Sequence, residues 1–100
     1  MTQGESRLSR QIADDIRARG GFVFKVHGSA AMMNGLPDLV GCYKARLIGI
    51  ETKMPGNTPS PVQRLRHKQI RAAGGIVAVV HSREEARAVL DRIDDAERNG

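Results

Sequence analysis

The chain has 100 residues, a length that allows one modest hydrophobic core and excludes two full-sized domains. Lysine and arginine outnumber the acids by 16 to 11, and the formal net charge of +5 favours a polyanionic partner, although an ordinary basic surface would explain it equally well. No apolar run approaches the ~20 residues that cross a membrane. The single cysteine, Cys42, excludes an intrachain disulfide and a zinc site of clustered cysteines. The polar start of the chain does not resemble a secretory signal, so we expect a cytoplasmic protein.

The first predicted element is a helix from about Gln3 to Ala18, which ends at a glycine pair. Leu8, Ile12 and Ile16 recur at a spacing of four and form its apolar face. Glu5 falls on the same face, where an acid needs an explanation. One explanation is a capping box with Thr2, and the other is an acid that reaches a metal site.

Residues 22–27 predict the first strand, and a loop with small residues at both ends follows over residues 28–35. Small residues let a backbone approach a phosphate closely, but an ordinary connection would have the same composition. His27 and Ser29 are therefore candidates for contact with DNA or a metal-bound water, and a structural histidine is the alternative for His27.

Two apolar runs follow. Asp38 lies near the start of the first run, and Glu51 lies near the end of the second. If they form a hairpin that turns at Lys44 and Ala45, residues whose numbers sum to 89 face each other, and Asp38 lies opposite Glu51. Two like charges at about 5 Å repel, so a divalent cation with oxygen ligands is the natural compensation. A slip of one residue would turn Asp38 to the opposite face.

Alternation along the second strand of this hairpin places Lys53 on the same face as Glu51, and Ile50 and Thr52 on the other. Acids and lysines are rare inside strands unless they are paired or bind metal. Two carboxylates, a cation and an ammonium group are the parts needed for metal-assisted hydrolysis of a phosphodiester.

The second half of the chain predicts a proline-rich loop, a helix over residues 61–73, a buried strand over 76–80 and a last helix opened by Ser82. The loop is expected to be a rim of the site, and the last helix to fray from Asp94 onward. Two inward faces are expected: Val62, Leu65, Gln69 and Ile70 in the first helix, and Ala86, Val89, Leu90 and Ile93 in the second.

Gln63 is open to two interpretations, as the third residue of a capping box with Ser60 or as a side chain beside the active site. We expect one side chain not to serve both roles easily. The same helix carries basic residues that either track a phosphate backbone or form a solvated face; the candidates for DNA contact are Arg64, Lys68 and Arg71. Aromatic residues are only 3% of the chain, which favours phosphate contacts over base stacking.

The ordered motifs resemble a known family. Pro37-Asp38 followed by Glu51-x-Lys53 is similar to the signature of PD-(D/E)XK nucleases. The set of Glu5, Gly35-x-Pro37-Asp38, Glu51-x-Lys53 and Ser60-x-x-Gln63 resembles the VRR-NUC subgroup over roughly residues 5–90.

This resemblance implies one small α/β domain over residues 1–100, with its core at about 5–93. It also implies a restriction-endonuclease-like mixed sheet flanked by helices in the order α-β-β-β-α-β-α. It further implies Mg²⁺ or Mn²⁺ held by Asp38, Glu51 and the Thr52 carbonyl, with Glu5 completing the acid set directly or through water. Lys53 would orient the attacking water or stabilise the phosphate, and Gln63 would lie beside the active site. Stand-alone members are similar to Holliday-junction resolvases, so branched DNA, a homodimer and a phage or bacterial origin are expected.

Two other classes of function remain open. A non-catalytic nucleic-acid-binding module would keep the basic surface but would have no need for an acid–acid–lysine set. A structural protein could bury Asp38, Glu51 and Lys53 as an ion-pair cluster, although such clusters rarely add stability over apolar packing.

Overall fold

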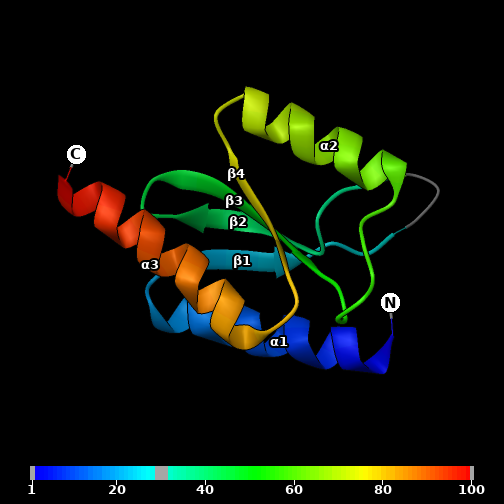
Figure 1. Cartoon of the computed structure of the whole chain (residues 1–100). Helices are drawn as coiled ribbons and strands as arrows, with labels where there is room; N and C mark the ends of the chain where they lie inside the picture. Colours follow the sequence, from blue (N-terminus) through cyan, green and yellow to red (C-terminus); the bar gives the residue numbers. More distant parts are fainter. Residues whose placement is uncertain (1, 29–31, 100) are drawn as a thin grey trace.

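The computed structural model describes residues 2–28 and 32–99 (Figure 1). The elements follow the expected order, and the predicted α/β class is confirmed. They are α1 (Gln3–Ala18), β1 (Phe22–Lys25), β2 (Leu39–Tyr43), β3 (Arg46–Thr52), α2 (Pro61–Ala72), β4 (Ile76–Val80) and α3 (Arg83–Asn99).

The four strands form one mixed sheet in the order β1-β2-β3-β4, antiparallel except for the parallel pair of β3 and β4. The predicted hairpin register is confirmed, because Leu39 faces Ile50 in the β2–β3 ladder. The turn lies at Lys44 and Ala45, whose φ angles of 51° and 65° are those of a tight hairpin turn with both central residues left-handed.

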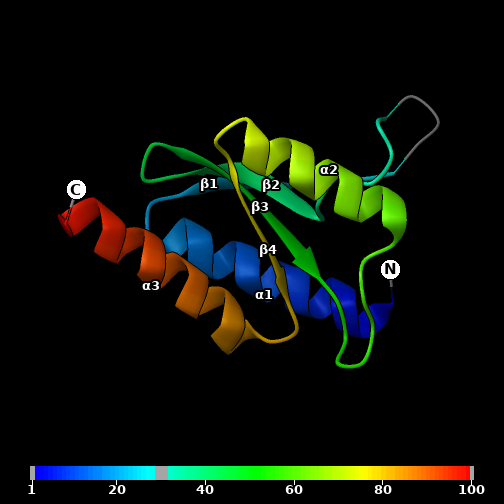
Figure 2. The same cartoon turned by 45° about the horizontal axis from the view of Figure 1, so that its top comes forward.

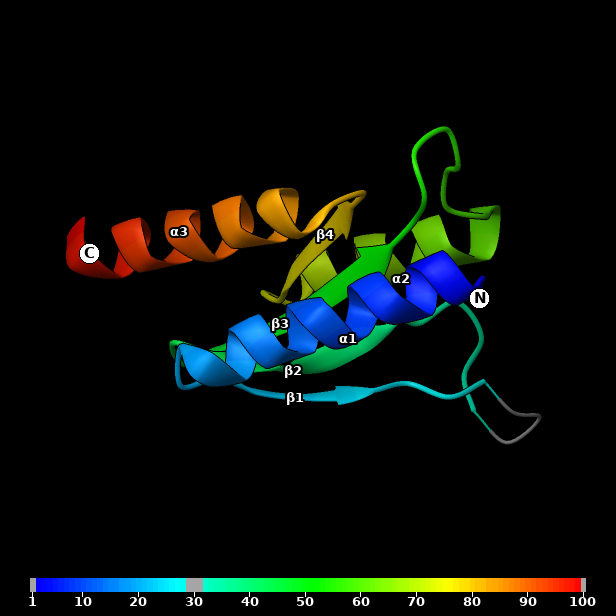
Figure 3. The same ribbon diagram turned by 90° about the horizontal axis from the view of Figure 1, so that it is seen from below.

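Helices cover the two faces of the sheet unequally. Figures 1 and 3 show α1 and α3 together on one face and α2 on the other. The hydrophobic core lies between the sheet and the helices α1 and α3, and among the described residues none of the core comes from α2. The inward residues predicted for α3 are confirmed, since Ala86, Val89, Leu90 and Ile93 are the buried residues of that helix.

The inward face predicted for α2 was wrong. Val62, Leu65 and Gln69 are exposed and Ile70 is only half-buried, whereas His67 is the buried residue of this helix. The apolar residues do not turn inward because the face of β3 that α2 covers carries Glu51. Polar side chains of α2 turn toward this acid.

Three smaller expectations need correction. The first strand ends at Lys25 instead of residue 27, and β4 is an edge strand whose residues Ile76, Ala78 and Val79 are only half-buried. Helix α3 continues to Asn99 instead of fraying from Asp94, because the Asp94 carboxylate accepts a hydrogen bond of 2.7 Å from the buried Tyr43 hydroxyl.

The proline-rich loop between β3 and α2 projects beyond the end of the sheet (Figures 2 and 3). Within residues 2–28 and 32–99, no helix is both long and apolar enough to cross a membrane.

Candidate active site

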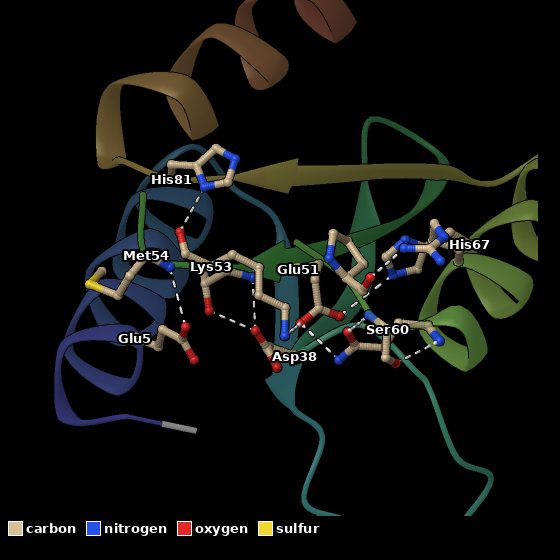
Figure 4. A network of polar contacts seen from close by, with 12 residues as sticks. Glu5, Asp38, Glu51, Lys53, Met54, Ser60, His67 and His81 are labelled. Carbon is tan, nitrogen blue, oxygen red and sulfur yellow. Dashed lines mark hydrogen bonds and ion pairs between the residues drawn. The ribbon is translucent and has the colours of Figure 1, made fainter. Parts of the chain in front are cut away.

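Polar side chains from four elements meet at the end of β3 (Figure 4). Asp38 directly precedes β2, Glu51 lies in β3, and Lys53 follows β3. Extending the β2–β3 ladder by one residue sets Asp38 opposite Glu51, as the sequence predicts. The first turn of α1 brings Glu5 to this edge of the sheet, and α2 brings Gln63 and His67.

The Asp38 carboxylate is held in one orientation by Thr52. Its Oδ2 accepts hydrogen bonds from the Thr52 amide at 2.8 Å and from the Thr52 hydroxyl at 2.6 Å. The hydroxyl was expected to point to the opposite face, but it turns toward Asp38 at the strand end. These two bonds fix the carboxylate through Oδ2 and leave Oδ1 as the oxygen that can serve a cation.

The backbone before Asp38 is positioned by packing. Pro37 is fully buried against Gly49 of β3, where an added Cβ would lie 2.7 Å from the proline ring. Because only glycine leaves this space, the Pro37-Asp38 segment can lie flat on β3. The packing of Pro37 on Gly49 therefore positions Asp38.

Glu51 is a buried acid without full compensation. Its exposure is 0%, and Oε1 has no hydrogen-bond partner among the described residues. Burial raises the pKa of Glu51 to about 8, and the neighbouring negative charge of Asp38 adds to the increase. A bound cation would offset the energetic cost of burying this acid, because it would stabilise the ionised carboxylate and lower the pKa of Glu51.

Lys53 lies on the same side as Glu51, as alternation predicts. Its Nζ is 3.9 Å from Glu51 Oε2, and its side chain is 18% exposed. Its backbone is held on both sides, since its N–H donates to the Val80 carbonyl at 3.0 Å and its carbonyl lies 2.9 Å from His81 Nδ1. The ammonium group thus lies beside the acids at the solvent-facing edge of the site.

Gln63 serves both of the roles that we expected to be mutually exclusive. Its Oε1 accepts from the Ser60 backbone N–H at 2.8 Å, while the Ser60 hydroxyl accepts from the Gln63 backbone N–H, which completes the capping box. The other end of the amide, Nε2, points at Glu51 Oε2 at 3.4 Å. The amide has an acceptor and a donor at opposite ends, so capping fixes the donor toward Glu51.

Glu5 forms only half of a capping box. The Thr2 hydroxyl accepts from the Glu5 backbone N–H at 3.1 Å, but the Glu5 carboxylate turns inward and accepts from the Met54 N–H at 3.2 Å. The side chain is buried at the edge of the site, and its charge contributes to the raised pKa of Glu51.

His67 is the site residue that the sequence analysis missed, since only the helix's basic residues and Gln63 were considered for the site. It is 2% exposed, and its Nε2 lies 3.5 Å from Glu51 Oε1. Burial and the nearby Arg71 lower its pKa. The signal was available in the spacing, because His67 follows Gln63 by four residues and lies on the same face of the helix.

The residues predicted to contact DNA do not gather at one place, in contrast to the acids of the site. His27 is exposed beyond the end of β1, and Ser29 lies outside the described residues. On α2, Arg64 donates to the Pro59 carbonyl and Arg71 to the Val77 carbonyl, whereas Lys68 is exposed.

The donor set suits a hard cation that retains water ligands. Among residues 2–28 and 32–99, no three His, Cys, Asp or Glu side chains lie close enough to hold one ion together. The site instead offers two adjacent carboxylates, and the negative charge of Asp38 is one cause of the raised pKa of the buried Glu51. One or two carboxylates plus waters are typical of Mg²⁺ sites. A hollow of about 160 Å³ next to the site is lined by Asp38 and by residues of the preceding loop.

Comparisons with known proteins agree with this geometry. A solved structure described as "VRR_NUC domain" superimposes with a TM-score of 0.76 at 25% identity, over 90% of this chain and 97% of that one. A protein of Acyrthosiphon pisum secondary endosymbiont phage 1, named "Putative nuclease p44", is 30% identical over 81 residues, which are 80% of this chain and 85% of that protein. No protein-family model matches the sequence.

Proposed function

Because the chain belongs to the VRR-NUC family of nucleases, we propose that it is a divalent-metal-dependent endonuclease that hydrolyses phosphodiester bonds in DNA. The observation that carries this proposal is the set of Asp38, Glu51 and Lys53 at one end of the sheet. Two adjacent carboxylates with a lysine beside them suit a cation and a phosphate better than they suit stability, since a buried acid with a raised pKa weakens the fold.

Asp38 and Glu51 would hold Mg²⁺ or Mn²⁺, with the Thr52 backbone carbonyl as a further ligand. Such an ion, when bound, supplies charge for the phosphate and lowers the pKa of a water. Glu5 would contribute through a water, since among the described residues no three acidic side chains lie close enough to hold one ion directly.

Lys53 would orient the attacking water or stabilise negative charge on the phosphate. Its ammonium is close enough to Glu51 to share the site and exposed enough to meet a substrate. Gln63 would hold Glu51 from the opposite side, because its amide N–H points at Oε2.

The proposal extends to branched DNA and to a homodimer. Cutting both strands of a junction needs two active sites, and a symmetric dimer supplies them. Surface candidates for the dimer contact include the exposed Met32 and Met33. Sedimentation analysis of the full chain tests this part, and a monomer at all concentrations would argue against it.

Lys68, Arg64 and Arg71 on α2 would meet the phosphate backbone, as would His27 and Ser29. The support for the α2 residues is that this helix carries the two side chains that point at Glu51, so DNA bound at the site would lie close to it. The net charge of +5 provides attraction that is independent of sequence.

The experiment that tests the function compares wild type with Asp38→Asn and Glu51→Gln in Mn²⁺ binding and in DNA cleavage. A nuclease binds Mn²⁺ and cuts, and both variants lose most of both properties. DNA binding that is equal in EDTA and in all three proteins, without cleavage, would favour a non-catalytic binding module instead. Absence of metal dependence together with altered stability would favour a structural ion-pair cluster.

A further inference from the structure

Two buried polar atoms in the site face each other, and neither has a hydrogen-bond partner in the part of the chain that the structure describes. They are Oε1 of Glu51 and Nε2 of His67, and both are sealed from solvent. The distance between them is 3.5 Å, slightly beyond the usual range for a hydrogen bond. Unsatisfied buried polar atoms are rare in folded proteins and costly, so a facing pair of them needs an explanation.

The two atoms can satisfy each other with little movement. A shift of about half an ångström would bring them within hydrogen-bond distance. A neutral imidazole has one N–H, which must lie on Nε2 to donate to a carboxylate. Such a bond would hold the Glu51 carboxylate in one orientation.

Helix α2 holds His67 and Gln63 against different oxygens of the same carboxylate. Gln63 Nε2 points at Oε2 at 3.4 Å, and His67 points at Oε1 from one helical turn further on. The capping box at Ser60 fixes the first turn of this helix, and the Arg66 side chain ties the helix to the Asn34 carbonyl. The two donors therefore come from one rigid support.

We propose that His67 is a positioning residue, whose Nε2–H donates to Oε1 of ionised Glu51 and, with Gln63, fixes the carboxylate for the cation. This assignment rests on the proposed metal-dependent nuclease function. Outer partners of this kind orient metal-binding groups, and their loss typically lowers metal affinity or activity by about 10- to 100-fold.

Other roles for His67 fit the geometry less well. Direct contact with DNA would require an exposed ring, and this ring is 2% exposed. Direct metal binding would require space between the facing atoms, but both are buried and only 3.5 Å apart. A histidine that only fills space would leave both Nε2 and Glu51 Oε1 unpaired, which is costly for buried polar atoms.

The test uses two variants of the full chain. His67→Leu fills the same space without a donor, and His67→Gln restores an N–H donor. The readouts are Mn²⁺ affinity by calorimetry, thermal unfolding in EDTA, and kcat for DNA cleavage at saturating Mn²⁺. Gln69→Leu, on the exposed side of the same helix, is the matched control.

We expect His67→Leu to unfold in EDTA at the wild-type temperature or above, yet to bind Mn²⁺ 10- to 100-fold more weakly and to show a lower kcat. His67→Gln should recover affinity to within about threefold of wild type. Wild-type Mn²⁺ affinity in His67→Leu would overturn the assignment, as would equal losses in both variants accompanied by a lower unfolding temperature. Wild type that neither binds Mn²⁺ nor cuts DNA would instead overturn the proposed function itself.

Discussion

At the scale of single residues, Glu51 distinguishes this site from an ordinary polar cluster. The acid is buried beside Asp38, and its pKa is raised to about 8 from an ordinary value of 4.5. In the absence of metal, the folded protein therefore retains a proton on Glu51 that the unfolded chain releases. The fold loses stability as pH rises through this range, which is the cost of burying this acid.

This linkage predicts how stability changes with pH. The cost of ionising Glu51 is absent below about pH 4.5, grows as pH rises, and is complete above about pH 8. Glu51→Gln removes this titration, so in EDTA its stability relative to wild type should increase from pH 5 to pH 8. Urea unfolding at several pH values measures the difference.

A metal addition and a control variant test the same prediction further. Saturating Mn²⁺ at pH 8 should stabilise wild type but not Glu51→Gln, because the ion binds only the folded site. The exposed Glu84→Gln should keep the wild-type profile. A constant difference between Glu51→Gln and wild type across this pH range would contradict the raised pKa.

At the scale of elements, the packing of Pro37 on Gly49 connects the sheet to Asp38, one of the two proposed metal ligands. A methyl group at position 49 would lie 2.7 Å from the Pro37 ring, so Gly49→Ala must displace the segment that carries Asp38. We expect a loss of about 1–3 kcal/mol in the free energy of unfolding. We also expect cleavage to fall about tenfold or more, since small misplacements of catalytic groups are costly.

Gly28→Ala is the control for stability, because a Cβ at that position meets no atom of the described residues within 4 Å. It should leave the free energy of unfolding near wild type. Cleavage by Gly49→Ala at the wild-type rate would show that Pro37 does not position Asp38.

The two ends of the Gln63 amide can be tested separately through its neighbour. Ser60→Ala removes the hydroxyl cap but keeps the bond from the Ser60 N–H to Gln63 Oε1, so it should cost about 1 kcal/mol and leave cleavage within a few-fold. Gln63→Met removes the donor that points at Glu51, so its cleavage should fall about tenfold or more. Chemical denaturation and initial rates measure the two effects, and equal rates for the two variants would assign Gln63 to capping alone.

The elements differ in how far the sequence could predict them. The hairpin was predictable because alternation and a two-residue turn fix its register, which places Asp38, Glu51 and Lys53 correctly. The orientation of α2 was not predictable from hydrophobicity, since its apolar residues face solvent and its polar ones face a buried acid. Predicting that His67 and Gln63 lie together would have required the assumption that α2 packs its polar face on Glu51 of β3.

At the scale of the whole molecule, the basic surface predicts strongly salt-dependent DNA binding. Each phosphate contact releases counterions, so affinity should fall steeply as salt increases. Lys68 is exposed on α2, and Lys68→Ala should reduce the slope of log affinity against log salt by about one.

Arg92→Ala tests whether this effect belongs to one face. Arg92 is exposed on α3, which covers the opposite side of the sheet from α2 (Figure 1). Its slope should match wild type in fluorescence-anisotropy titrations at several salt concentrations. Equal reductions in both variants would mean that DNA does not prefer the α2 face.

The measurement that tests the central claim is cleavage of a labelled four-way junction and a matched linear duplex with Mg²⁺ or Mn²⁺. It compares wild type with Lys53→Ala, and with Lys44→Ala at the far end of the hairpin as the control. We predict metal-dependent cutting by wild type and Lys44→Ala, a preference for the junction, and a loss of about 100-fold or more in Lys53→Ala with DNA binding retained. No cutting of either substrate by wild type, or unchanged cutting by Lys53→Ala, would contradict the account.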